Sequence, residues 1–260
     1  MGFRDSLGRA GLRLLGAALL VLAFAPLYRV MDLSAESPFR EVSVRVADAT
    51  LQVVWWGTLV TVLLAAVLAV LVPAGRLRAA ASAAAERVAR PPRPLFALAA
   101  GAIATGIACL VAYTLYRGFF TNVDEIASTL HARYLAQGRL SGPALERPEF
   151  WLVPNMLMVP EGWVSQYPPT HLLALALVNR LGIPVLLGPL SFGAMVALLA
   201  LSLERLLPEE PALARIAAAA VAASPLLFFL GGGSMNHVTA GALLAAALYA
   251  ALRARDGSAA

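Results

Sequence analysis

Asp124 and Glu125 stand side by side just after a long apolar run that ends at residues 116–120. A carboxylate at the centre of a bilayer costs roughly 2.5–3.5 kcal/mol, and this cost decreases towards the membrane interface. A partly desolvated carboxylate at such a boundary can act as a general base for a hydroxyl group without further catalytic residues. We therefore take both acids as candidate catalytic residues.

The same two acids also fit a purely structural interpretation, the start of a helix. Thr121 or Asn122 would cap the helix, and acids in its first turn would complement the helix dipole. Asp124, Ser128 and His131 follow at i, i+4 and i+7 and share one face of that helix. His131 is therefore a candidate substrate-binding residue beside the acid pair.

Residues 165–171, Ser-Gln-Tyr-Pro-Pro-Thr-His, combine a double proline with two side chains that can bind a substrate. Proline fixes φ, lacks an N–H donor and suits the first position of a helix. In one interpretation the segment is only a rigid start to the next helix. In the other it holds Tyr167 and His171 over a cavity.

Residues 231–237, Gly-Gly-Gly-Ser-Met-Asn-His, lie between two apolar runs, and Pro225 just before them predicts a kinked span. Three glycines allow a close approach of the backbone or a flexible turn. Asn236 and His237 are either polar caps of the next helix or ligands of a phosphate or an acceptor.

Several classes of site have no support in the sequence. There is no HExxH, CxxC, Walker or dinucleotide-binding motif, and the acids and histidines do not have metal-site spacing. We therefore expect no cofactor, and the sequence leaves dependence on a divalent metal open without supporting it. The arginines are spread over loops without interleaved aromatics, so we expect no nucleic acid partner. The single cysteine, Cys109, excludes an intrachain disulfide.

An apolar composition determines the elements that must position these residues. Of the 260 residues, 60% are hydrophobic and 13% are charged, and the mean hydropathy is +0.77. This predicts an all-α, polytopic transmembrane bundle in contact with membrane lipid. The segment 170–181 is too short to span and predicts an interfacial or re-entrant helix in the outer loop. The predicted spans, about six, are 11–30, 51–74, 95–120, 183–206, 212–231 and the shorter 237–252.

The arginines predict the orientation of these spans, because cytoplasmic loops carry more positive charge. With a cytoplasmic N-terminus, twelve of the twenty arginines fall on the inner side, and no lysine is present. The acid pair and all three histidines then lie outside. We expect a multi-pass protein of the bacterial inner membrane, with its active site on the periplasmic side. Residues 1–94 would form two spans and a basic cytoplasmic loop, and 95–260 a second module with a periplasmic loop at 121–182.

The order of these motifs resembles glycosyltransferase family 39, the relatives of protein O-mannosyltransferases and lipid A aminoarabinose transferases. The resemblance covers about residues 95–252. It is carried by Asn122-Val123-Asp124-Glu125, Ala132-Arg133, Gly138-Arg139-Leu140, Pro148-Glu149-Phe150, Ser165-Gln166-Tyr167-Pro168-Pro169, Gly182-Ile183-Pro184, Ser224-Pro225 and Ser234-Met235-Asn236-His237.

The resemblance implies a GT-C fold and an inverting transfer of a sugar from a polyprenyl-phosphate donor to a hydroxyl acceptor. Asp124 would be the general base, with Glu125 beside it, and no nucleotide-sugar site is expected. Arg133, Arg180 and His237 are placed at the donor phosphate by their predicted side of the membrane, not by a matched motif. The full set of predicted substrate-binding residues is His131, Arg133, Tyr167, His171, Arg180, Asn236 and His237.

The chain is shorter than members of that family and stops after its sixth apolar segment. The alternative is therefore a non-catalytic or split-protein membrane subunit, or a scaffold, that works with a partner subunit in envelope glycosylation. A transporter is a weaker candidate, because the spans carry few polar groups and no paired broken helices.

Overall fold

The computed structural model describes residues 55, 59, 62–63, 74–120, 122–147 and 154–258. The predicted span 11–30 and nearly all of the span 51–74 lie outside these residues. The chain divides into two compact units, Met1–Arg87 and Val88–Ala260. The residues with candidate chemistry all belong to the second unit.

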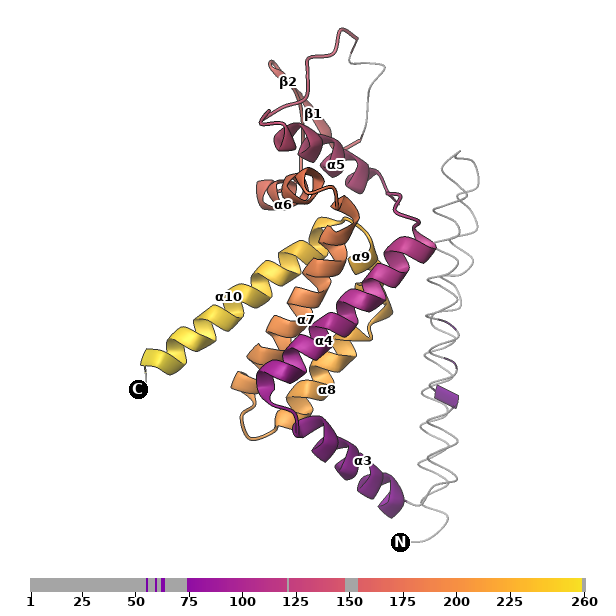
Figure 1. The fold of residues 1–260 in the computed structure, drawn as a ribbon, viewed down its shortest axis with the longest axis vertical. Coiled ribbons are helices and arrows are strands. Elements are labelled where there is room, and N and C mark those ends of the chain that lie inside the picture. Colours follow the sequence, from indigo (N-terminus) through magenta and orange to yellow (C-terminus); the bar gives the residue numbers. More distant parts are fainter. Residues whose placement is uncertain are drawn as a thin grey trace. The chain divides into compact units, whose positions relative to one another are not determined.

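Helices make up most of the described chain (Figure 1). The helix α4 (Arg93–Leu110) continues into a π-helical turn, Val111–Leu115, and a short 3-10 turn, Pro184–Leu186, leads into α7 (Leu187–Leu206). The elements are α3 (Ala74–Ala89), α4 (Arg93–Leu110), α5 (Val123–Ala136), β1 (Met156–Val159), β2 (Gly162–Ser165), α6 (Pro169–Arg180), α7 (Leu187–Leu206), α8 (Pro211–Ala222), α9 (Pro225–Gly232) and α10 (Asn236–Ser258).

Three of the described helices are long and apolar enough to cross a membrane: Arg93–Leu115, Pro184–Leu206 and Asn236–Gly257. The helices α8 and α9 make a fourth if together they form one span. The helix axis bends by 54° between them. This bend confirms the kink predicted at Pro225. These helices are consistent with a membrane protein.

The last predicted span is present but is longer than predicted. Its predicted limits, 237–252, made it marginal as a span, whereas α10 begins at Asn236 and continues to Ser258. The apolar run ends before Arg253, but the backbone hydrogen bonds of a helix do not depend on side-chain polarity. Arg253 and Arg255 therefore continue the same helix, and α10 is long enough to span.

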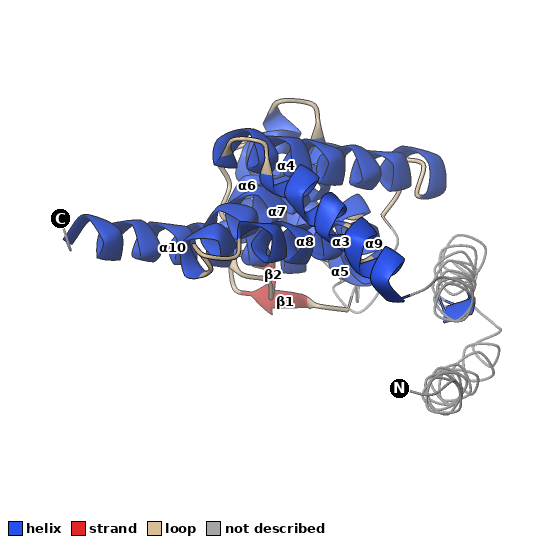
Figure 2. Cartoon of the chain, turned by 90° about the horizontal axis from the view of Figure 1, so that it is seen from below, coloured by secondary structure: helices blue, strands red, loops and turns tan. Residues whose placement is uncertain are grey.

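One correction concerns the expectation of an all-α chain. The strands β1 and β2 form an antiparallel hairpin in which Met156 pairs with Ser165 and Val159 with Gly162 (red in Figure 2). Gly142 adds one further bridge, to Trp163. The segment alternates too briefly to predict strands from the sequence.

The short helix predicted at 170–181 is present as α6, and it packs against α5. Ala132 of α5 and Leu175 and Val178 of α6 share one apolar cluster, which also includes Leu187 at the start of α7. We refer to α5, the hairpin and α6 together as the α5–α6 layer. In Figure 1 this layer lies at one end of α4, α7 and α10.

Small residues bring α4 and α7 into close contact. Ala104 and Ala108 of α4 are fully buried with Phe192 and Val196 of α7. A Cβ on Gly101 would lie 2.8 Å from the carbonyl oxygen of Gly193. Helices within membranes associate largely through such small residues, because the hydrophobic effect gives no attraction between them there.

A buried ion pair joins the helices at the end remote from the α5–α6 layer. Arg215 Nε of α8 donates to Glu204 Oε1 of α7 at 2.6 Å, and Arg215 Nη1 donates to the Val88 carbonyl oxygen at 2.7 Å. Arg93 Nε lies 3.3 Å from Glu204 Oε2. Because an unpaired buried charge is very unfavourable, these contacts hold the α7–α8 turn against the start of α4.

The α4–α7 contact predicts opposite effects for two matched glycine substitutions. A Cβ on Gly193 would overlap the Thr105 hydroxyl and lie 2.6 Å from the Gly101 carbonyl oxygen, whereas a Cβ on Gly106 finds nothing within 4 Å. Gly193→Ala should lower stability by about 1–3 kcal/mol through overpacking. Gly106→Ala should be neutral or gain up to about 1 kcal/mol from helix propensity.

Thermal unfolding of the detergent-solubilised protein measures both effects. The Tm of Gly193→Ala should lie clearly below that of Gly106→Ala. Equal Tm values would mean that α4 and α7 do not approach as closely as described.

Candidate functional site

The predicted helix at the acid pair is α5, and Asn122 is its cap. Asn122 Oδ1 accepts a hydrogen bond from the Glu125 N–H at 2.9 Å. Asp124 and Glu125 both lie in the first turn. Since successive residues of an α-helix are about 100° apart around its axis, the two carboxylates point to different sides. Asp124 is partly exposed, whereas Glu125 is only 1% exposed.

Polar side chains from the region of the hairpin hold Asp124. Asn155 Nδ2 donates to Asp124 Oδ1 at 2.6 Å, and the Tyr167 hydroxyl lies close to the same carboxylate. Burial, and next the nearness of Asp124, raise the pKa of Tyr167. Tyr167 therefore stays protonated at neutral pH, with its hydroxyl available to donate to Asp124. A partly exposed carboxylate that accepts from Asn155 has a defined orientation.

Glu125 turns inwards and binds a backbone group of the 231–237 segment. The Ser234 N–H donates to Glu125 Oε1 at 2.7 Å. A side chain at Gly233 would overlap the same carboxylate oxygen, which accounts for a glycine at this position. The contact joins residues 109 positions apart in the chain.

His171 binds the other side of the same peptide segment. Its Nε2 lies 3.1 Å from the Ser234 carbonyl oxygen, and its Nδ1 lies 3.2 Å from Thr239 Oγ1. A carbonyl can only accept, so Nε2 carries the proton and Nδ1 accepts from Thr239. Ser191 Oγ extends the chain at 3.4 Å from Thr239 Oγ1. We call Glu125, His171, Ser191, Ser234 and Thr239 the Ser234 clamp.

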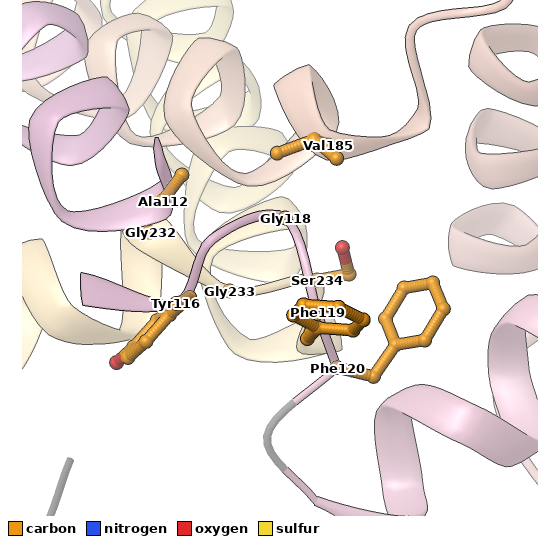
Figure 3. Close-up of a pocket in the computed structure, with 9 residues that line it drawn as sticks. All are labelled: Ala112, Tyr116, Gly118, Phe119, Phe120, Val185, Gly232, Gly233 and Ser234. Carbon is orange, nitrogen blue, oxygen red and sulfur yellow. The ribbon is translucent and has the colours of Figure 1, made fainter. Parts of the chain in front are cut away.

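A small hollow lies beside the clamp (Figure 3). It is open to solvent and has room for little more than one water molecule. Tyr116 at its wall donates from its hydroxyl to the Phe229 carbonyl oxygen at 3.0 Å. The lining residues are Ala112, Tyr116, Gly118, Phe119, Phe120, Val185, Gly232, Gly233 and Ser234.

His131 lies within the α5–α6 layer, with both ring nitrogens in hydrogen bonds. The Ser165 N–H donates to Nδ1 at 3.1 Å, and Nε2 lies 2.9 Å from the Leu140 carbonyl oxygen. The ring also contacts Trp163 edge-on. His131 is buried, and these contacts favour a structural role, in which it holds the hairpin against α5, over the predicted contact with a substrate.

The remaining predicted substrate-binding residues are accessible. Arg133 of α5, Arg180 of α6 and His237 of α10 are exposed, and Asn236 is partly exposed. His237 is close enough to His171 for its charge to contribute to lowering the His171 pKa. The structure thus brings Tyr167 to Asp124, and His171 to the Ser234 peptide bound by Glu125.

Five residues of these clusters were absent from the predicted set: Asn155, Gln166, whose Nε2 donates to Asn155 Oδ1, Ser191, Ser234 and Thr239. Gln166 and Ser234 belong to motifs singled out in the sequence, but nothing in their types indicated a role. Asn155 contacts Asp124 across 31 positions of the chain, and no periodicity links them. Its φ of 69° is one that asparagine tolerates better than most residues.

Comparison with known proteins gives no match: no protein-family model, curated protein or solved structure matches the chain. Membership of glycosyltransferase family 39 and the GT-C fold therefore stay predictions. Within the described residues, no group of three or more His, Cys, Asp or Glu side chains is placed to hold a metal ion.

The clamp predicts a pH dependence of stability. Burial lowers the pKa of His171, so the folded protein keeps this ring neutral, whereas an unfolded histidine titrates near pH ~6.5. Below that pH the unfolded state binds a proton that the folded state does not, and stability falls. The Tm of the wild type should decrease from about pH 7.5 to about pH 5.5, and His171→Gln should remove part of that decrease.

His237→Gln is the matched control, because its ring is exposed and only a minor cause of the lowered pKa. It should keep most of the wild-type pH dependence. A profile of His171→Gln parallel to that of the wild type would show that His171 is not held neutral by the fold.

Proposed function

We propose that this protein is an integral membrane glycosyltransferase that transfers a sugar from a polyprenyl-phosphate donor to a hydroxyl acceptor. The observation that carries the proposal is the different placement of the two acids. Glu125 is buried in the Ser234 clamp, whereas Asp124 is partly exposed and held by Asn155, with Tyr167 close by. The order of motifs that resembles glycosyltransferase family 39 supports the choice of reaction.

In the proposed reaction Asp124 removes the proton of the acceptor hydroxyl. The acceptor oxygen forms a bond to the anomeric carbon from the face opposite the phosphate. The bond between the anomeric carbon and the phosphate oxygen breaks, and its electron pair leaves with the polyprenyl phosphate. The anomeric configuration is therefore inverted, and a single carboxylate base is sufficient.

The surroundings of Asp124 suit a donor that is part lipid and part phosphate. The ring of Phe119 is exposed beside the small hollow and offers an apolar surface to an isoprenoid unit. Arg133, Arg180 and His237 are exposed cations or hydrogen-bond donors for the leaving phosphate. The proposed site faces the periplasm of a bacterial inner membrane, as the arginine distribution predicts.

The proposal predicts a large loss of activity in Asp124→Asn. The purified protein is mixed with polyprenyl-phosphate sugars and hydroxyl acceptors, and transfer is measured by mass spectrometry of the product. Removing a general base should lower kcat by about 10²–10⁴-fold. The asparagine side chain still accepts the hydrogen bond from Asn155 Nδ2, so the fold should be kept.

Glu161→Gln is the control, because Glu161 is an exposed acid in the turn between β1 and β2. It should keep wild-type kcat. Transfer that is unchanged in Asp124→Asn would reject this residue as the base. Absence of transfer by the wild type with every donor, together with a fixed partner in native membranes, would favour the alternative of a non-catalytic subunit.

A further inference from the structure

Gln166 is an exposed residue whose amide group binds the donor to Asp124. Its Nε2 donates to Asn155 Oδ1 at 2.6 Å. Asn155 Nδ2 in turn donates to the Asp124 carboxylate at 2.6 Å. Gln166 itself does not need to touch a substrate to affect the base.

The direction of these hydrogen bonds follows from the chemistry of an amide. The carbonyl oxygen of Asn155 accepts from Gln166, so its NH₂ group must face Asp124. One side chain therefore sets the orientation of the amide that donates to Asp124.

The backbone supports the same arrangement independently of the Gln166 side chain. The Gln166 N–H donates to the Asn155 carbonyl oxygen at 3.1 Å, next to the end of the hairpin. Ser165, the preceding residue, is held by His131. Substitution of the exposed Gln166 side chain therefore leaves the contacts that fold this segment in place.

We propose that Gln166 is a positioning residue that orients Asn155, and through it the Asp124 carboxylate, for proton removal from the acceptor. This inference rests on the proposed glycosyl transfer. Small displacements of a catalytic group have large effects on rate, and ~1 Å can cost ~10²-fold. Loss of the orienting amide should therefore affect kcat more than KM.

Two substitutions separate orientation from charge. Gln166→Met removes the amide at similar size without adding charge, and should lower kcat by about 3–10-fold with little change in KM. Gln166→Glu offers only acceptors, so Asn155 must turn its NH₂ group to Glu and its carbonyl oxygen towards Asp124. This variant should lower kcat by at least about tenfold.

Gln137→Glu is the matched control, since Gln137 is an exposed glutamine at the C-terminal end of α5. The same transfer assay is applied to the full chain in detergent, with polyprenyl-phosphate sugars as donors. We expect kcat to decrease in the order wild type, Gln166→Met, Gln166→Glu, with Gln137→Glu within about twofold of the wild type. The Tm of all variants should stay close to that of the wild type.

The possible failures can be told apart. If Asp124→Asn abolishes transfer but Gln166→Met keeps wild-type kcat, the positioning role is wrong and the proposed function stands. If kcat falls in Gln166→Glu but not in Gln166→Met, the positioning role is also wrong, because the added negative charge alone would explain the loss. If the wild type transfers no sugar, the proposed function and this inference both fall.

Discussion

A single buried peptide group, that of Ser234, connects the long helices to the layer that carries the candidate base. Leaving a buried N–H or C=O without a partner costs about 1–3 kcal/mol, so a chain that buries one must supply partners. Here the N–H is bound by Glu125 of α5 and the carbonyl by His171 of α6. The helices α5 and α6, which are both far from Ser234 in the sequence, are therefore held against the turn between α9 and α10.

This constraint explains the arrangement around Asp124. When Glu125 is bound to Ser234, the rotation of α5 about its axis is determined, and the neighbouring Asp124 must point elsewhere. The segment 154–167 then reaches Asp124 with Asn155 and Tyr167. The acid pair thus divides into one residue that holds the fold and one that is accessible to a reactant.

The local features of the fold were largely readable from the sequence. Prolines at positions 169, 211 and 225 begin α6, α8 and α9, because proline suits the first turn of a helix. The cap at Asn122 and the bend before α9 followed from similarly local chemistry. The hairpin and the full length of α10 did not, since short strands and polar helix ends give no clear periodicity.

The sequence by itself determined which segments are apolar enough to span, where helices begin, and that Asp124 and Glu125 share a first turn. These properties depend on neighbouring residues only. Only the tertiary structure decided that Glu125 binds Ser234 while Asp124 accepts a hydrogen bond from Asn155. It also decided that the ring nitrogens of His131 and His171 form hydrogen bonds inside the protein. Those contacts join residues 9 to 109 positions apart, and their partners are determined by how helices pack, not by spacing in the chain.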